Sequence, residues 1–131
     1  MRLLVDTHLV LWRQTGDPRL SQRAIDLMDD DANTVDVSAL SVWEVAVKHA
    51  LRREGKVGLP LSGKQFLAEL RATGLTPIPI TPDHAAAVDD LPLHHRDPFD
   101  RLLIAQARCE GMSLLTHDAA LADYGAWVFV V

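Results

Sequence analysis

The chain has 131 residues, of which 48% are hydrophobic and 24% charged, and its formal net charge is −5. This length and composition are typical of one globular domain, so we expect a single domain over residues 1–131. The negative charge argues against a protein that binds nucleic acid through a broad basic surface, but it allows an enzyme that grips phosphates through a bound cation.

Apolar runs and helical stretches alternate along the chain. In chain order, the pattern predicts a strand over 2–6, helices over 8–14 and 21–30, a strand over 34–39, helices over 41–54 and 62–73, a strand over 76–80, helices over 82–91 and 97–111, a strand over 113–118, a short helix over 119–125 and a strand over 126–131. The helix ends carry local signals: Ser21 is a candidate N-cap, Pro98 suits a first turn, and Gly55, Gly74 and Gly111 suit helix stops.

The alternation of strands and helices predicts an α/β fold with a mainly parallel sheet covered by helices on both faces. Pro77 and Pro79 cannot donate backbone hydrogen bonds, so the strand over 76–80 is expected at an edge. With right-handed crossovers, this favours five strands in the order 3-2-1-4-5. The chain then reverses between strands one and four, where a ligand crevice is expected at their carboxyl ends.

One cysteine, Cys109, excludes an internal disulfide and suits a reducing compartment, so we expect a cytoplasmic protein. The start of the chain, MRLLVDTHLVLW, lacks a long apolar core with a small-residue cleavage site, which argues against a signal peptide. The apolar runs are shorter than the ~20 residues of a membrane span, so we expect no membrane association.

Acidic residues gather at the carboxyl end of the predicted sheet. Asp6 ends the first strand, and Asp118 closely follows the fourth. Glu44 lies at the start of the helix after the second strand, and Asp100 at the start of the helix before the fourth. Clustered carboxylates repel one another unless a cation neutralises them. Oxygen ligands suit Mg²⁺ or Mn²⁺, so the pattern predicts metal-dependent phosphoryl chemistry.

Each of these acids also has a structural explanation. The two that follow strands suit helix N-caps. Ser41 and Glu44 have the spacing of a capping box, and Glu44 precedes Lys48 by four residues, as in a helical ion pair. Asp97 is a natural N-cap, with Asp100 in the third helical position.

Four blocks in this order resemble the PIN-domain ribonucleases, and in particular the VapC-type toxins of prokaryotic toxin–antitoxin modules: LLVDTHLVLW, SALSVWEVAVK, HRDPFDRLLIAQA and LLTHD. The resemblance runs from residue 2 to about residue 130. It implies a three-layer α/β/α sandwich with a parallel five-stranded sheet. It also implies Mg²⁺- or Mn²⁺-dependent endonucleolytic cleavage of RNA, a homodimer, and inhibition by a cognate antitoxin protein.

Matched by position, the resemblance implies that the catalytic, metal-binding acids are Asp6, Glu44, Asp100 and Asp118. Asp97 lies in the same block, but N-capping explains it better.

Other residues beside the acids are accessory candidates. Thr7, Ser41 and Thr116 could orient waters or ligands, with capping or strand-end hydrogen bonds as the alternative. Arg101 could contact substrate phosphate or antitoxin, with a local ion pair as the alternative.

Histidines and one helix face also invite a functional interpretation. His94, His95 and His117 lie near the acids, but the adjacent pair falls in a loop and is expected to be solvated. An apolar stripe at Trp43, Val47 and Ala50 is expected in the core or on a dimer surface. A basic patch at Lys48, Arg52 and Arg53 is either a solvated helix end or a guide for phosphate.

Two other functional classes stay open. An aspartyl-phosphate phosphohydrolase of the haloacid-dehalogenase type also has an acid at the end of strand one, but it needs a second acid two residues later, where His8 stands. A receiver-like or other non-catalytic cation-binding domain could also use the acids. A receiver needs a phosphoacceptor aspartate at the end of its third strand, where the sequence offers only Asp83, at a predicted helix start.

Overall fold

In the computed structural model, residues 1–131 are described, with the exception of the side chain of Arg53. The helices and strands are β1 (Arg2–Val5), α1 (Thr7–Thr15), α2 (Gln22–Asp29), β2 (Thr34–Asp36), α3 (Ala39–Arg53), α4 (Gly63–Ala72), α5 (Pro82–Ala87), the 3₁₀ helix η1 (Val88–Asp90), α6 (Pro98–Cys109), β3 (Ser113–Thr116), the 3₁₀ helix η2 (Ala119–Tyr124) and β4 (Val128–Val130). Among these described residues, no helix is both long and apolar enough to cross a membrane.

Over the described residues, the sheet has four strands in the order β2-β1-β3-β4, and all neighbouring pairs are parallel. Leu4 at the centre of β1 lies opposite Asp36 on β2 and Leu114 on β3. The α/β class, the parallel pairing and the central position of the first and fourth predicted strands are confirmed. The prediction of five strands is wrong.

The predicted third strand, over 76–80, makes an isolated bridge instead of a strand. The N–H of Ile78 donates to the carbonyl of Val37 at 2.8 Å, and the carbonyl of Ile78 accepts from Ala39 N–H at 2.8 Å. Pro77 and Pro79 flank Ile78 and have no N–H to extend the ladder. The segment therefore lies at the predicted edge, beside the end of β2, but pairs there through Ile78 alone among the described residues.

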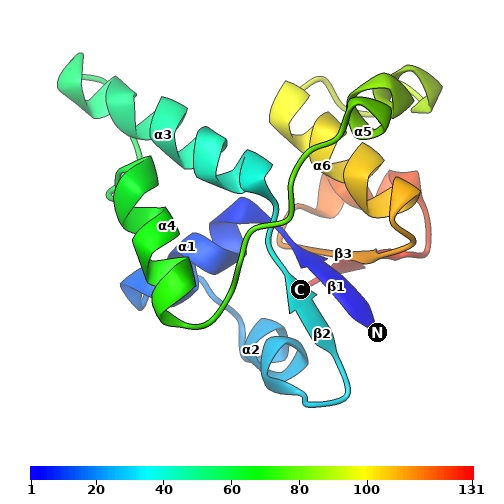
Figure 1. Ribbon diagram of the computed structural model, residues 1–131, viewed down its shortest axis with the longest axis horizontal. Coiled ribbons are helices and arrows are strands. Elements are labelled where there is room, and N and C mark those ends of the chain that lie inside the picture. The colour runs from blue at the N-terminus through cyan, green and yellow to red at the C-terminus, as the bar shows by residue number, and fades with distance from the viewer.

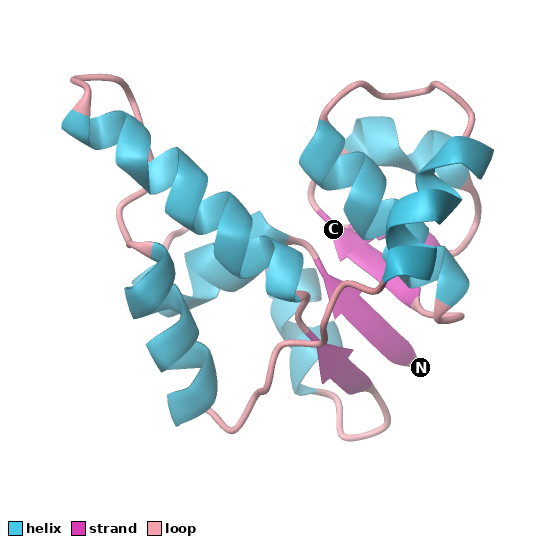
Figure 2. Ribbon diagram, turned by 45° about the horizontal axis from the view of Figure 1, so that its top comes forward, coloured by secondary structure: helices cyan, strands magenta, loops and turns pink.

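Helices cover both faces of the sheet, as Figures 1 and 2 show. Alternate side chains of β1 point to opposite faces, as strand geometry requires. Leu3 and Val5 pack into a core with residues of α1, α2, α3 and α4. Leu4 packs into the core on the other face, with residues of α6 such as Ile104. The arrangement is the expected three-layer α/β/α sandwich.

Helix α3 begins earlier than predicted, at Ala39, because Ser38 is its N-cap and accepts a hydrogen bond from Leu40 N–H at 3.0 Å. The predicted capping box of Ser41 and Glu44 is therefore wrong. Both residues lie inside the helix, where Ser41 is 0% exposed and Glu44 is 4% exposed. Glu44 is thus available for a role other than capping.

Helix α4 packs closely against α3 because it begins with a glycine. Ser62 and Gln65 form a capping box around this start. A Cβ atom at Gly63 would come within 2.7 Å of the Cβ of Ala46 on α3, so any larger residue would force the two helices apart. This close contact supports the helix that carries Glu44.

Candidate active site

The carboxyl ends of β1 and β3 lie side by side and bring their following residues together. Asp6 directly follows β1, and its N–H donates to the carbonyl of Leu115 at 2.9 Å. Thr116, the last residue of β3, donates its hydroxyl hydrogen to Oδ2 of Asp6 at 2.6 Å. The second contact joins residues that are 110 positions apart in the chain. The predicted meeting point of strands one and four is confirmed.

Asp6 is 4% exposed, yet its surroundings favour the ionised carboxylate. Burial by itself raises the pKa of Asp6, but hydrogen bonds from His8 and Thr116 outweigh burial and hold the pKa below its ordinary value. The backbone N–H of His8 donates to Oδ1 at 3.1 Å, so Asp6 also caps α1. The prediction that Asp6 caps a helix is thus confirmed. Its ionised carboxylate can still serve as an oxygen ligand for a cation.

Asp100 lies in the first turn of α6, and its pKa shifts in the opposite direction from that of Asp6. Its pKa is raised from 3.8 to about 6, first by burial and then by the negative charges of Asp97, Asp6 and Glu44. A hydrogen bond of 2.7 Å from His95 Nε2 to Oδ2 acts in the other direction. Because charges interact over short distances, the shift indicates that these acids, predicted from separate elements, face a common space.

Asp118 joins the same group while serving as a helix cap. Its Oδ1 accepts from Ala120 N–H at 3.0 Å at the start of η2, which confirms the capping explanation. Its own N–H donates to Thr116 Oγ1 at 3.1 Å. One ligand atom from each of His95, Asp100 and Asp118 lies within 4.8 Å of the others, a spacing that could hold a metal ion.

Glu44 reaches the site from α3 and pairs with Lys48 one turn later, as the spacing predicted. Burial alone would lower the pKa of Lys48, but the hydrogen bond to Glu44 and the charges of Asp97 and Asp100 raise it. The ammonium group therefore lies within the field of the acids. Lys48 also belongs to the basic patch expected from the sequence, of which the side chain of Arg53 lies outside the described residues.

Asp97 starts helix α6, as predicted. Its Oδ1 accepts from Phe99 N–H at 2.8 Å and from Asp100 N–H at 3.2 Å. Both bonds orient the first turn that carries Asp100, so Asp97 is a positioning residue for its neighbour.

This assignment gives a paired prediction at one position. Asp97→Ala should lower the free energy of unfolding by about 1 kcal/mol, whereas Asp97→Ser should keep most of it because serine also caps helices. Urea denaturation of both variants measures the difference. Equal stability of the alanine and serine variants would contradict the capping role.

The other accessory candidates make contacts within the protein. The hydroxyl of Thr7 donates to Ser41 Oγ at 2.8 Å, which ties α1 to α3 beneath the acids. Arg101 donates to backbone carbonyls of the loop before α6, including those of Pro92 at 3.1 Å and His95 at 3.3 Å. The expected local ion pair of Arg101 is absent among the described residues. A contact of Arg101 with phosphate or antitoxin stays a prediction.

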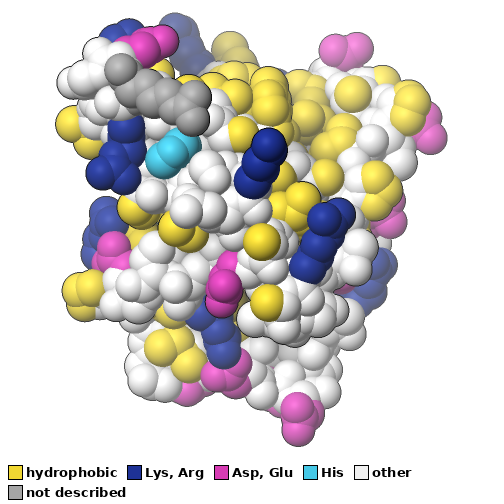
Figure 3. All heavy atoms as spheres, turned by 60° about the vertical axis from the view of Figure 1, so that its left-hand side comes forward, with side chains coloured by type: hydrophobic (Ala, Val, Ile, Leu, Met, Phe, Trp, Pro, Cys, Tyr) yellow, Lys and Arg dark blue, Asp and Glu magenta, His cyan; other side chains and the backbone are white. Residues whose placement is uncertain are grey.

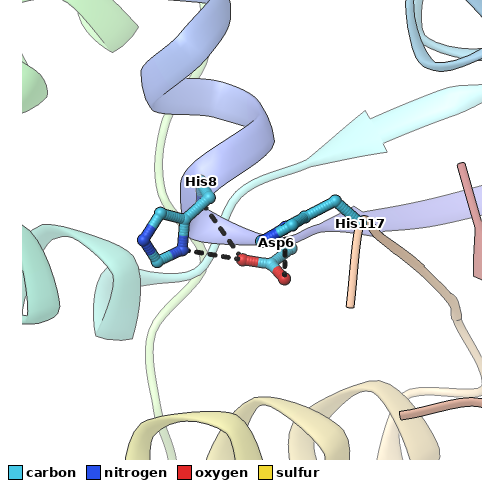
Figure 4. A group of neighbouring side chains, drawn as sticks. All are labelled: Asp6, His8 and His117. Carbon is cyan, nitrogen blue, oxygen red and sulfur yellow. Dashed lines mark hydrogen bonds and ion pairs between the residues drawn. The ribbon is translucent and has the colours of Figure 1, made fainter. Parts of the chain in front are cut away.

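Histidines contribute more to the site than the sequence analysis predicted. His95 was expected to be solvated, but its side chain is 23% exposed and bonds to Asp100. His8 Nδ1 lies 3.8 Å from Asp6 Oδ1, and His117 Nδ1 lies 3.9 Å from Asp6 Oδ2 (Figure 4). The pKa of His8 is raised, chiefly by its interaction with Asp6. The sequence signal for His8 was its place two residues after a strand-end acid.

The apolar stripe on α3, expected in the core or on a dimer surface, lies at the surface, which excludes the first of these two alternatives. Trp43 is 58% exposed and Val47 is 41% exposed. Trp43 also lines a groove of about 570 Å³ between α3 and α4, together with Val42, Ala46 and Leu67. Figure 3 brings this side of the molecule forward and shows apolar side chains across its upper part, with Lys and Arg side chains among them. A dimer surface here stays a prediction.

Comparisons with known proteins agree with the fold and with the order of the motif blocks. The family model of the PIN domain matches residues 3–126. Ribonuclease VapC22 of Mycobacterium tuberculosis (strain ATCC 25618 / H37Rv) is 31% identical over 123 residues, which cover 93% of this chain and 91% of that protein.

A solved structure is similar in fold at lower identity. It is the crystal structure of VapBC2 from Rickettsia felis bound to a DNA fragment from their promoter, matched with a TM-score of 0.68 and 14% identity over 100% of this chain and 98% of that one. The match of the PIN-domain model to residues 3–126 agrees with the sheet order and with the acids at the carboxyl end of the sheet, and the chain belongs to the PIN-domain family.

Proposed function

We propose that the chain is a metal-dependent endoribonuclease that acts as the toxin of a toxin–antitoxin module. The observation that carries the proposal is the position of Asp100, which lies beside Asp118 within 4.8 Å and has a pKa raised to about 6, first by burial and then by the charges of Asp97, Asp6 and Glu44. The relative named as a ribonuclease, 31% identical over nearly the whole chain, supports RNA as the substrate.

The donor set fits a hard divalent cation. Asp6, Glu44, Asp100 and Asp118 offer carboxylate oxygens, which Mg²⁺ and Mn²⁺ prefer. Burial and the negative charges of neighbouring acids raise the pKa of Asp100, and a bound divalent ion would offset both effects by stabilising the ionised carboxylate. When bound, such an ion would lower the pKa of a water molecule and offset the charge that develops on the scissile phosphodiester.

The residues around the acids hold them in place. Thr116 and the backbone of His8 orient both oxygens of Asp6, while His95 orients Asp100. Asp118 is fixed by its own bonds at the start of η2 and completes the cluster or serves a second ion. Oriented carboxylates lose little freedom when they bind a cation, and this raises the affinity of a metal site.

The test is RNA cleavage by the purified chain, free of antitoxin, with total cellular RNA as the substrate. Discrete fragments are expected with Mg²⁺ or Mn²⁺ and should disappear with EDTA. Addition of the cognate antitoxin should suppress them. A folded sample that cuts nothing with either metal would contradict the proposal and favour a non-catalytic cation-binding domain.

The partners are proposed on the same basis. We expect the antitoxin to place a basic side chain among the acids, because the cluster carries excess negative charge.

We also expect a homodimer, for which the exposed Trp43 and Val47 offer an apolar contact surface. Light scattering on the sample used for cleavage should give the dimer mass at micromolar concentration, and a monomer there would contradict this part.

A further inference from the structure

Asp6 faces two imidazole rings as well as the carboxylate cluster. Nδ1 of His8 lies 3.8 Å from Oδ1 of Asp6, and Nδ1 of His117 lies 3.9 Å from Oδ2. One ligand atom of each of the three residues lies within 4.8 Å of the others. Figure 4 shows the two rings beside the same carboxylate, one from the start of α1 and one from the residue that follows β3.

The distances from the two histidine nitrogens to the carboxylate oxygens of Asp6 are longer than a hydrogen bond. They are closer to the separation of two ligand atoms that bind the same ion. Hydrogen bonds between nitrogen and oxygen usually span about 2.7–3.2 Å. Two ligands bound to Zn²⁺ at about 2.1 Å each, with tetrahedral angles, lie about 3.4 Å apart. The three ligand atoms lie within 4.8 Å of one another, so the two rings would have to turn inward to reach that separation on one ion.

Contacts with neighbouring residues hold the three candidate ligands in place, as outer contacts do for metal ligands. Thr116 and the His8 N–H already bind the two oxygens of Asp6. The ring of His117 packs at 4.6 Å from that of Trp12, which is only 6% exposed and so anchored in the core. The side chains of His8 and His117 remain 30% and 36% exposed, which leaves an ion access from solvent. Such outer contacts fix ring orientation and raise metal affinity.

We propose that Asp6, His8 and His117 form a second cation site, selective for a borderline transition-metal ion of the Zn²⁺ class. Two imidazoles and one carboxylate suit Zn²⁺, Co²⁺ or Ni²⁺, whereas Mg²⁺ prefers oxygen ligands throughout. Because Asp6 is also one of the four acids proposed above to hold the hard cation, Zn²⁺ bound there would compete with that cation for it. This inhibitory consequence rests on the proposed nuclease function; the binding site itself does not.

The binding test uses the full chain without RNA or antitoxin, in excess Mg²⁺. Co²⁺ serves as the probe, because its visible absorption reports nitrogen ligands, and Zn²⁺ should displace it. His8→Ala and His117→Ala should each weaken Zn²⁺ binding by at least about tenfold. His8→Ala keeps the backbone N–H that donates to Asp6, so this substitution removes only the imidazole ring. His94→Ala is the matched control, because His94 packs against Tyr124 and lies outside both ligand groups.

The outcomes separate this site from the proposed function. Histidine-dependent Zn²⁺ binding without any RNA cleavage would support the site while the nuclease proposal fails. Cleavage with Zn²⁺ affinity unchanged in both His8→Ala and His117→Ala would overturn the site and leave the nuclease intact. Affinity lost in His95→Ala instead would also overturn it, in favour of the group around Asp100. If both hold, Zn²⁺ should inhibit the wild type more strongly than His117→Ala, with each protein compared with its own rate in Mg²⁺ alone.

Discussion

Asp6→Asn and Asp100→Asn are each expected to lower Mg²⁺-dependent RNA cleavage at least about a hundredfold, which corresponds to about 3 kcal/mol of lost transition-state stabilisation. Asparagine has the shape of aspartate but carries no charge, so it binds a divalent cation far more weakly. Asp6 is one of two strand-end acids, and Asp100 stands opposite it on α6, so removal of either charge should disrupt the cluster. Cleavage rates at saturating Mg²⁺ measure the effect.

A matched control separates the site from the general loss of one charge. Asp123→Asn removes an exposed carboxylate from η2, outside the described acid groups, and should cleave at the wild-type rate. Circular dichroism should show that all three variants remain folded. Full activity in Asp6→Asn or Asp100→Asn would refute the assignment of these acids.

The second large effect concerns stability in the absence of metal. The pKa of Asp100 rises from 3.8 to about 6 on folding, so between these values the folded state binds more protons than the unfolded state. The free energy of unfolding should therefore fall as the pH rises from about 4 to about 6, by up to about 3 kcal/mol for a shift of this size. This contribution is fully present below pH 3.8 and lost above about pH 6.

Urea denaturation in EDTA across this range measures the loss, and Asp100→Asn isolates it from other titrating groups. The variant should lack this part of the pH dependence and should be more stable than the wild type at pH 7, by about 1–3 kcal/mol. Mg²⁺ at pH 7 should restore the wild type, since binding to the folded state adds to stability. Equal stability of the two proteins at pH 7 in EDTA would contradict the repulsion inferred for Asp100.

Much of the fold and of the acidic site could be predicted from the sequence, because the relevant signals are local. Apolar runs that end in an acid predicted β1 with Asp6 after it and β3 with Asp118 after it. Proline and N-cap chemistry predicted the start of α6 with Asp97 as its cap. Parallel strands connected by helices place their carboxyl ends at one edge of the sheet. Strand order by itself therefore predicts that the acids at these ends lie near one another.

The tertiary structure decided what depends on contacts between distant segments. The predicted third strand became a bridge at Ile78, since the prolines on either side of it could not pair with the neighbouring chain. That bridge lies beside Ser38, and it is Ser38 and not Ser41 that caps α3.

The meeting of His8 and His117 around Asp6, the hydrogen bond from His95 to Asp100, and the raised pKa of that acid are likewise tertiary. Local sequence sets which side chains occur at each strand end. The distances and burial that set their charges arise only when β1 and β3, more than a hundred residues apart, lie side by side.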